Sequence, residues 1–534
     1  MLIYNYINIF NIYRKKVTFD KITFSLGGQS SRYFTKPGYN IKIKDGKDLF
    51  GRRQLKLRSD VVEASYMRTK LVSDIHQRLG LPGIAANYAT LYINNEYMGL
   101  FIITDSYKKS WVEFEYGEKN TTSLYKCDYL YSFLSSQSSS YSCINANDKA
   151  TDNSEFQNFL KTLDAAQSAA DIEDIFDVDQ FLTEMDLEYL LGAWDHYIFY
   201  GHNYFMYKPK GGKWTYLSHD FDLDLGQSID KVIMDVIIVD LPERMEKLNL
   251  DYPNYSYGDW IKHQHLTDIL IFKNPERFET ILKNVVKKAF NPTVLYPHID
   301  ELKEFIRPYV KKDKTPNSKG VLPGVINTAA NDYYSYEQWE ANTEFTSVKE
   351  VQYFGYGIKY WILAKYRNVC QTFKDLECDE TFLDENYYYP IDEKVEFPGY
   401  FGKPTTPRPG SSKPVSGHSS TTTPTKTATQ SKPSKTSKPQ NQCWSELIGY
   451  PCCPSGVTTV YAQNEYGDWG YDFEKNTWCG LTAYEEPKSS QEPCWSETLG
   501  YSCCKGCQVI TSDSSGSWGI ENNQWCGTPS YCKN

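Results

Sequence analysis

The chain has 534 residues, of which 15% are aromatic and 23% charged, and its formal net charge is -10. This length exceeds what one hydrophobic core usually organises, so it indicates several domains. The acidic balance disfavours nucleic acid as a partner, because nucleic-acid binders carry a basic excess. A mean hydropathy of -0.56 and the lack of an apolar run of about 18 residues disfavour a membrane span.

The N-terminal residues carry no export signal of the usual form. Residues 2–13 are rich in Tyr and Asn, and the basic cluster Arg14, Lys15 and Lys16 follows the apolar stretch instead of preceding it. Strand-like sequence, VTFDKITFSL, comes next. We therefore expect an incomplete N-terminus, with a protein that is not secreted as the alternative. Two sequons, at Asn120 and Asn254, favour secretion.

Residues 1–395 are predicted to form one large α+β domain. Alternating segments such as Tyr39–Ile43 and Ala89–Ile93 indicate strands, and Asn94 and Asn95 indicate the turn of a hairpin. The serine-rich residues 132–141 are expected to form a mobile loop. Apolar residues at helical spacing predict helices over residues 67–79, 178–194 and 353–366.

An aromatic segment, residues 213–226, carries three acidic residues at alternating positions. Its apolar alternation predicts an extended strand, with Asp220, Asp222 and Asp224 on one face at a spacing of about 7 Å. Carboxylates this close must lie in water or be neutralised by a cation. An EF-hand is excluded, because Gly226 and Lys231 stand where that loop needs other residues. The two remaining interpretations are a solvated edge strand and an oxygen-only Mg²⁺ site completed by substrate phosphates.

Several fragments, in order over about 200 residues, resemble the CotH family of spore-coat and surface protein kinases. The fragments are SSRYFTKPGY from Ser30, LFG from Leu49, YMR from Tyr66, LYINNEYMGLF from Leu91, Asp195, HNY from His202 and DFDLDLG from Asp220. The resemblance implies an atypical protein-kinase-like fold that uses ATP with Mg²⁺ or Mn²⁺ to phosphorylate protein hydroxyls. The sequence departs from the family at Asp105, where a Glu is usual, and this shorter side chain would weaken a pairing with Lys36.

The same resemblance assigns roles to single residues. The roles implied are Asp195 as the catalytic carboxylate, Asn203, Asp220 and Asp222 as metal ligands, and Lys36, Arg32 and Arg68 as nucleotide-binding cations. Lys36 would lie on a strand. A structural ion pair is the alternative role for Arg68. We interpret His202 and His219 as supporting residues, since Mg²⁺ prefers oxygen ligands.

Residues 396–442 are predicted to form an extended linker. From residue 403 onward they hold seven Pro, seventeen Ser or Thr, seven Lys or Arg and no acidic residue. Such a composition cannot build a core and is typical of an O-glycosylated connector. A shorter linker is expected at residues 481–493.

The last 92 residues hold ten of the fourteen cysteines, within two repeats. CWSELIGYPCC from Cys443 recurs as CWSETLGYSCC from Cys494, and a later WCG recurs at the same relative place. Modules this small need covalent staples, so we expect two disulfides in the first repeat and three in the second, formed in an oxidising compartment. Zinc is the alternative, but paired C-x2-C spacing and histidine are missing. The cysteines concerned are Cys443, Cys452, Cys453, Cys479, Cys494, Cys503, Cys504, Cys507, Cys526 and Cys532.

These repeats resemble the fungal dockerin, a cysteine-rich module of cellulosomal enzymes. The resemblance implies two modules, 443–480 and 494–532, that bind a cohesin-like scaffold protein of an extracellular, anaerobic-fungal cellulosome. The contact residues implied are Tyr450, Trp469, Tyr501, Asp513 and Trp518. Asn464 stands where the first copy would carry the acidic contact, so equal affinity of the copies is not implied. Aromatic residues that fill the small cores, and a carbohydrate-binding module, are the alternatives.

The sequence thus predicts a secreted protein kinase attached to a cellulosome, with a protein as phosphoacceptor. A non-catalytic structural or adhesive component, held by the same modules, is the first alternative. A polysaccharide-degrading enzyme is the second, and it would need two carboxylates about a sugar bond, which the sequence does not single out.

Overall fold

The computed structural model divides the chain into two compact units, residues 1–417 and 418–534. The residues described are 7–10, 16–28, 32–59, 61–229, 251–349, 354–397, 443, 451–454, 457–458, 462–464, 467–472, 477–481, 496, 502–503, 511–512, 517–521 and 524–527. Within them, no helix is both long enough and apolar enough to cross a membrane.

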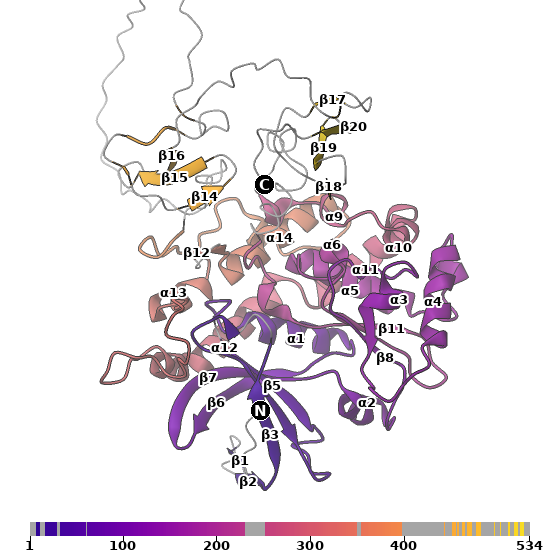
Figure 1. Ribbon diagram of the computed structural model, residues 1–534, viewed down its shortest axis with the longest axis horizontal. Coiled ribbons are helices and arrows are strands. Elements are labelled where there is room, and N and C mark those ends of the chain that lie inside the picture. The colour runs from indigo at the N-terminus through magenta and orange to yellow at the C-terminus, as the bar shows by residue number, and fades with distance from the viewer. Residues whose placement is uncertain are drawn as a thin grey trace, which may run out of the picture. The chain divides into compact units, whose positions relative to one another are not determined.

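An antiparallel five-stranded sheet occupies one end of the large unit (Figure 1), with the strand order β3-β4-β5-β7-β6. The strands are β3 (Ile22–Leu26), β4 (Tyr39–Ile43), β5 (Gln54–Arg58), β6 (Ala86–Ile93) and β7 (Glu96–Asp105). On β5, Leu55 and Leu57 face an apolar cluster of the sheet, so the alternate residues Gln54, Lys56 and Arg58 face the other side.

A second sheet, with the order β11-β10-β8-β9, lies among the helices of the large unit. Its strands are β8 (Leu124–Cys127), β9 (Cys143–Asn145), β10 (Tyr204–Tyr207) and β11 (Thr215–Ser218). Two short hairpins pair β1 (Ile7–Phe10) with β2 (Lys16–Phe19) and β12 (Val348–Lys349) with β13 (Phe354–Gly355).

Helices make up most of the rest of the large unit. They are α1 (Arg68–Leu79), α2 (Lys109–Tyr116), α3 (Ser139–Ser142), α4 (Ser154–Ala165), α5 (Val178–Leu191), α6 (Tyr197–Tyr200), α9 (Tyr257–Trp260), α10 (His265–Thr267), α11 (Pro275–Lys288), α12 (Pro292–Asp313), α13 (Tyr336–Asn342), α14 (Ile358–Thr372) and α15 (Glu380–Leu383). Separate sheet and helix regions confirm the predicted α+β class.

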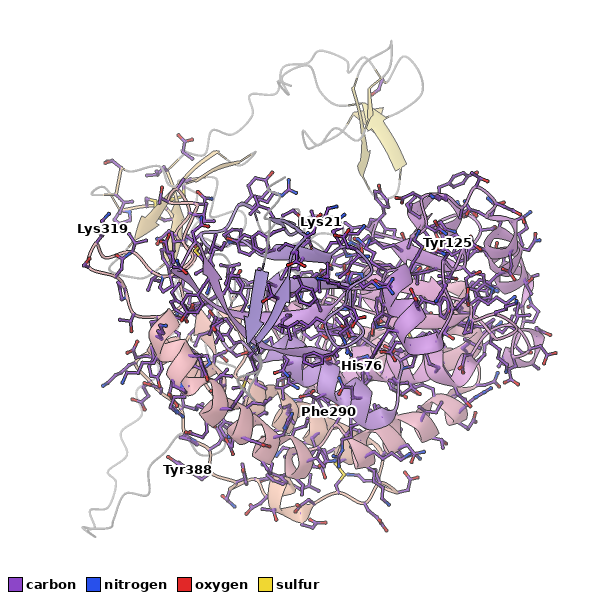
Figure 2. The ribbon with its side chains drawn as sticks, turned by 90° about the horizontal axis from the view of Figure 1, so that it is seen from below. Lys21, His76, Tyr125, Phe290, Lys319 and Tyr388 are labelled. Atoms are coloured by element: carbon purple, nitrogen blue, oxygen red, sulfur yellow. A yellow bond between two sulfur atoms is a disulfide. The ribbon has the colours of Figure 1, made fainter. Side chains whose placement is uncertain are left out.

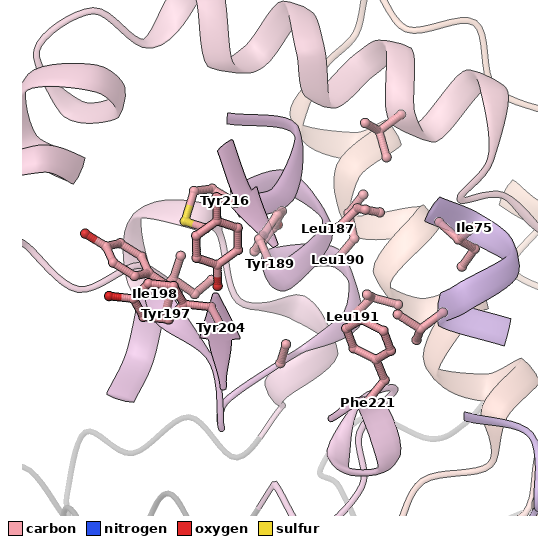
Figure 3. Packing of buried hydrophobic residues seen from close by; sticks show 14 of the residues in the cluster. Ile75, Leu187, Tyr189, Leu190, Leu191, Tyr197, Ile198, Tyr204, Tyr216 and Phe221 are labelled. Carbon is pink, nitrogen blue, oxygen red and sulfur yellow. The ribbon is translucent and has the colours of Figure 1, made fainter. Parts of the chain in front are cut away.

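The core of the large unit is rich in aromatic rings. Tyr197, Tyr204 and Tyr216 lie together beside α5 (Figure 3), with ring centroids 4.9 to 5.8 Å apart. His76, in α1, is also buried, whereas Lys319 and Tyr388 lie at the surface of the unit (Figure 2). Close aromatic packing of this kind fixes the elements that carry the polar residues described below.

The large unit confirms some of the predicted elements and corrects others. β4, β6 and α1 form where expected, and the hairpin turn places Asn94 and Asn95 at φ 51° and 64°. α5 stops at Leu191, because Gly192 takes the left-handed conformation that ends a helix. α14 begins only at Ile358, since Phe354 pairs in a short strand.

The serine-rich residues 132–141 do not form an open loop. Their hydroxyls bind nearby carbonyls, as Ser139 does to Phe133 at 2.8 Å, and α3 begins within them. A disulfide between Cys127 and Cys143 closes the segment, and a second joins Cys370 to Cys378. The predicted mobile loop did not account for these hydrogen bonds of the serine hydroxyls.

The described parts of the second unit are short strands. β14 (Ala462–Asn464), β15 (Gly467–Asp472) and β16 (Thr477–Gly480) form one antiparallel sheet. β17 (Ser502–Cys503), β18 (Thr511–Ser512), β19 (Ser517–Glu521) and β20 (Gln524–Gly527) form another. Corresponding residues of the two repeats therefore form β-sheets, as expected for small disulfide-rich modules.

Candidate functional site

The acidic segment after β11 is a turn and not the strand that its alternation predicts. β11 ends at Ser218, Asp220 adopts φ 79°, and Phe221–Leu223 form a single 3₁₀ turn. The left-handed conformation at Asp220 breaks the strand, so Asp220, Asp222 and Asp224 do not share one face. The alternation instead serves packing, because Phe221 stacks between the buried rings of His76 and His196.

Gly226 fixes the end of this turn. Its φ is +74°, and a Cβ there would lie 2.4 Å from the ring of Trp361. Only glycine therefore combines this backbone conformation with the close approach of α14.

Arg58 of β5 lies between two of the acidic residues. Its Nη1 donates to Oδ2 of Asp222 at 2.6 Å, and its Nη2 pairs with Oδ1 of Asp220. Burial tends to raise the pKa of Asp220, but Arg58, Lys56 and His219 lower it more. Burial raises the pKa of Asp222 despite Arg58, and the charge of Asp220 adds to that rise. One guanidinium thus joins two carboxylates of unequal acidity.

Asp224 lies apart from this pair. Its carboxylate is buried and accepts no hydrogen bond from the described residues, and Nδ1 of His196 lies 3.6 Å from its Oδ1. Burial, followed by the nearby acids Glu188 and Asp222, raises its pKa well above the usual value. Burial likewise lowers the pKa of His196 to about 4. Burial thus disfavours the charged forms of both Asp224 and His196.

Asp195 and Asn203 are in direct contact. Nδ2 of Asn203 donates to Oδ2 and to the main-chain oxygen of Asp195, both at 2.9 Å. Nδ1 of His202 lies 3.3 Å from the other carboxylate oxygen, and its Nε2 donates to the carbonyl of Asp128 at 2.7 Å. Asn203 adopts φ 54°, which turns the chain so that both side chains reach Asp195. Asp195 is thus fixed from two sides.

Asp128 and His219 connect the two halves of the site. Nε2 of His219 lies 3.2 Å from Oδ1 of Asp128, and its Nδ1 lies 3.9 Å from Oδ2 of Asp220. His219 also donates its backbone N–H to the carbonyl of Asn203. Polar contacts therefore lead from Asp195 through His202 to the backbone carbonyl of Asp128, and from the side chain of Asp128 through His219 to the Asp220–Arg58 pair. The predicted residues Asp195, Asn203, Asp220 and Asp222 are brought together in one cluster.

Basic residues that the sequence analysis missed lie at this cluster. Besides Arg58, they are Lys56 on β5, Lys126 on β8 and Lys108 before α2, which interact with one another electrostatically. Burial lowers the pKa of Lys56 to about 8 and that of Lys126 to about 8, with neighbouring cations adding to both shifts. The alternation Gln-Leu-Lys-Leu-Arg did place Lys56 and Arg58 on one strand face, but it could not tell which face meets the acidic turn.

Lys36 is not placed as predicted. It lies before β4, outside any strand, and its buried Nζ contacts Oδ1 of Asp313 at 2.8 Å and the carbonyl of Leu100 at 3.0 Å. The hollow beside it has a volume of about 20 Å³, which is the room of one water and not of a triphosphate. Lys36 is held by its ion pair with Asp313, at the end of α12. Asp313 is remote in sequence, so the local pattern around Lys36 could not predict this contact.

Arg68 also differs from a phosphate-binding arrangement, whereas the role implied for Arg32 stays a prediction. The guanidinium of Arg68 is fully buried and donates to Glu63, Asn342 and the carbonyls of Asp224 and Tyr356. This matches the structural alternative. Arg32 is exposed at the surface.

Asp105 does not reach Lys36 either. Its Oδ1 pairs with Nε of Arg52 at 2.6 Å, and its Oδ2 accepts the backbone N–H of Ala85 at 3.2 Å. The shorter side chain of Asp105 was expected to weaken a pairing with Lys36, and in the structure the carboxylate of Asp313 contacts Lys36 instead.

In the second unit, the first repeat forms two disulfides, the predicted number, and the structure pairs Cys443 with Cys452 and Cys453 with Cys479. Trp469 and Trp518 lie on β15 and β19, and Cys503 and Cys526 lie on β17 and β20. The remaining predicted positions lie outside the described residues: Tyr450, Tyr501, Asp513, Cys494, Cys504, Cys507 and Cys532.

Comparisons with known proteins cover both units. The family model described as CotH kinase protein matches residues 24–345, and the model described as cellulose or protein binding domain matches residues 442–481 and 493–528. Spore coat protein homolog 1 of Rhizopus delemar is 26% identical over 300 residues, which cover 53% of this chain and 46% of that protein. Endoglucanase B of Neocallimastix patriciarum is 52% identical over 46 residues, which cover 9% of this chain and 10% of that protein.

Among solved structures, the double dockerin from Piromyces equi Cel45A is 30% identical, with a TM-score of 0.07, and the match covers 18% of this chain and 93% of that one. The chain spans less than half the length of the two curated relatives named above. The first family model alone covers more than half of the chain, over the residues that build the polar cluster. The chain therefore belongs to the CotH kinase protein family and carries two C-terminal modules of the cellulose or protein binding type.

Proposed function

We propose that the large unit transfers phosphate from ATP to protein hydroxyls with Mg²⁺ or Mn²⁺, and that the two modules attach it to a cellulosomal scaffold outside the cell. The polar cluster from Asp195 to Arg58 carries this proposal. It combines carboxylates with cations around a partly open position: the side chains of Asp195, Asp220 and Asp222 are 21%, 30% and 18% exposed. Phosphoryl transfer needs such positioning and charge neutralisation more than it needs covalent chemistry.

The residues present fit a hard divalent cation. Asp220 and Asp222 converge on one guanidinium, so their oxygens reach a common positive charge. Asn203 commits Nδ2 to Asp195, while no described residue donates to its Oδ1. Mg²⁺ is usually held by one or two carboxylates together with substrate phosphates, so a three-acid cage is not needed. When bound, the ion would neutralise charge on the transferred phosphoryl group.

The protein's own residues would divide the remaining work. Asp195, held by Asn203 and His202, would accept the hydrogen of the acceptor hydroxyl and orient its oxygen. Arg58 and Lys56 would bind phosphate oxygens, because both face the acidic turn from β5. They take the role that the sequence had assigned to Lys36 and Arg68.

One observation favours the non-catalytic alternative. Arg58 already pairs with both Asp220 and Asp222, and Lys56 adds a second positive charge nearby, so the two carboxylates are balanced without a metal ion. In a structural or adhesive component this ion pair would be permanent. In an enzyme Arg58 would exchange a carboxylate partner for phosphate.

Two variants test the catalytic proposal. Asp222→Asn should remove Mg²⁺-dependent ATP binding, measured by calorimetry, and with it the transfer of radiolabelled phosphate to a mixed protein substrate. Asp195→Asn should keep metal-dependent ATP binding but lower transfer by about a hundredfold or more, the usual contribution of a positioned acid or base.

The exposed Asp148→Asn serves as the matched control and should change neither quantity. A folded wild-type chain that binds no nucleotide with either metal ion would overturn the catalytic proposal in favour of the structural alternative.

Attachment through the modules is tested separately. Changing Tyr450 and Trp469 to Ala should weaken binding to native fungal cellulosome modestly, because the second module still holds. Changing Tyr501 and Trp518 as well should abolish it, since two linked sites gain affinity from effective concentration. A quadruple variant that is still retained in a pull-down would show that these aromatic residues only fill module cores.

A further inference from the structure

The loop closed by the Cys127–Cys143 disulfide is held firmly in place. Its ends are paired strands, since Cys127 lies opposite Cys143 in the β8–β9 ladder, and β8, α3 and β11 lie near one another in Figure 1. Inside it, Ser132 Oγ donates to the carbonyl of Tyr129 at 2.6 Å, and the buried Leu134 donates its N–H to the hydroxyl of Tyr197 at 3.3 Å. Disulfide, hydroxyls and core contact together fix the loop backbone.

This fixed loop presents apolar side chains to solvent. Tyr129, Leu130 and Tyr131, here called the aromatic ledge, are 62%, 54% and 58% exposed. Tyr131 adopts φ 65°, an uncommon conformation for a bulky residue, while its N–H donates to the carbonyl of Tyr200 at 2.7 Å. Consecutive exposed apolar residues on a rigid support are typical of binding surfaces, because little side-chain and backbone freedom is lost on contact.

The aromatic ledge adjoins the residues that hold Asp195. Asp128, immediately before it, accepts a hydrogen bond from His202 and lies 3.2 Å from His219. Just after it, Ser132 donates its N–H to the carbonyl of Gly201, two residues before Asn203. The ledge therefore borders the Asp195 side of the cluster, whereas Lys56 and Arg58 approach the acidic turn from β5.

We propose that the aromatic ledge binds the polypeptide that carries the acceptor hydroxyl, and selects segments with an apolar side chain close to the acceptor serine or threonine. This inference names the kind of acceptor and so rests on the phosphotransfer proposed above. The ledge holds no charged side chain, which disfavours a phosphate-bearing ligand. Tyr131 meets Tyr200 edge-on at 74° instead of forming a flat platform for a sugar ring. Tyrosines on a rigid loop are typical protein-binding anchors.

The test measures binding first, so that it does not depend on catalysis. Fluorescent peptide pools with a central Ser, each with one flanking position fixed as Leu, Phe, Lys, Asp or Gly, are titrated with the full chain and followed by anisotropy. We expect the Leu and Phe pools to bind best. The variant Tyr129→Ser, Leu130→Ser, Tyr131→Asn should weaken them by about tenfold or more, the cost of truncating anchor residues.

Two further variants guard against misfolding and unspecific effects. Leu130→Lys changes only the middle of the ledge and should weaken the same pools in the same direction. Tyr388→Ser removes a tyrosine that is 60% exposed elsewhere and should leave binding unchanged. A triple variant that binds as the wild type does, a wild type that shows no apolar preference, or binding of cello-oligosaccharides that the triple variant loses would each overturn the proposal.

Transfer to the same pools separates the two proposals. If the ledge variants lose the apolar preference while the wild type transfers no phosphate, the docking surface stands and the phosphotransfer fails. If the wild type phosphorylates all pools equally and the triple variant matches it, the phosphotransfer stands and the docking surface fails.

Discussion

Two polar clusters of the large unit contain the same kinds of residue but differ in their contact with water. In the site cluster, Arg58 bridges Asp220 and Asp222, and the three side chains are 18% to 30% exposed. In the second, here called the arginine cluster, Arg68 binds Glu63 and Asn342 and is fully excluded from solvent. An arginine surrounded by protein oxygens has no donor to spare for a ligand. Exposure, and not residue type, thus separates a binding group from a structural one.

Arg68→Met should have the largest effect on stability, because it leaves Glu63 buried without its cation. We expect a loss of about 3–5 kcal/mol in the free energy of unfolding, the usual cost of breaking a buried pair. Urea unfolding followed by tryptophan fluorescence measures it.

Arg277→Met is the control, since that arginine pairs with Glu173 and Asp179 near the surface and should cost less than about 1 kcal/mol. If Arg68→Met unfolds like the wild type but fails to bind ATP, exposure does not separate the two arginines by role. Arg68 would then be assigned to the nucleotide site.

Arg58→Met should have an intermediate effect, and on binding more than on folding. Removing hydrogen bonds to a charged ligand should weaken ATP binding by about ten- to a hundredfold. At the same time Asp220 and Asp222 lose their shared cation, so Mn²⁺ should bind more tightly when nucleotide is absent. Calorimetry with Mn²⁺ alone and with ATP gives both numbers. A lower affinity for Mn²⁺ alone would show that the arginine supports the carboxylates and does not compete with the ion.

Asp186→Asn should have the smallest effect, and it probes a buried acid that has no hydrogen-bond partner among the described residues. Both carboxylate oxygens of Asp186 in α5 lack a hydrogen bond from the described residues, and burial raises its pKa well above the usual value. Above the unfolded pKa of about 4, the unfolded chain loses a proton that the folded chain keeps, so stability falls as the pH rises. Asparagine does not titrate, so the free energy of unfolding of the variant should rise relative to that of the wild type as the pH rises.

The gain is about 1.4 kcal/mol per pH unit at most, which unfolding curves at about pH 5 and about pH 6 can resolve. A stability difference between variant and wild type that is the same at both pH values would mean that Asp186 is ionised in the folded chain.

The sequence predicted the acidic half of the site and missed its basic half. The acidic half lies in short fragments whose order is visible along the chain, and its residues are Asp195, Asn203, Asp220 and Asp222. Lys56 and Arg58 sit in an ordinary amphipathic strand, and only the packing of β5 against the turn after β11 shows what they face. The contact of Lys36 was missed for the same reason, because its partner Asp313 lies 277 residues away. Local patterns cannot report contacts between distant segments.

The fold shows the same division between local and distant causes. α1 and the β6–β7 hairpin depend on spacing and turn residues, and both were predicted correctly. The strand predicted through residue 225 failed because apolar alternation also suits a turn that buries Phe221 between two imidazoles. The Cys127–Cys143 bridge depends on the register of β8 and β9, which cysteine counting does not supply.

The positive φ of Asp220, 79°, bears on any attempt to increase the thermal stability of this chain. Glycine adopts that conformation without steric cost, whereas a residue with a Cβ does so under strain. A directed-evolution screen for heat resistance would therefore set two effects of Asp220→Gly against each other: a relaxed backbone, and the loss of the ion pair with Arg58 that lowers the pKa of Asp220. Descendants selected for heat resistance would keep this acid only where the ion pair outweighs the backbone strain.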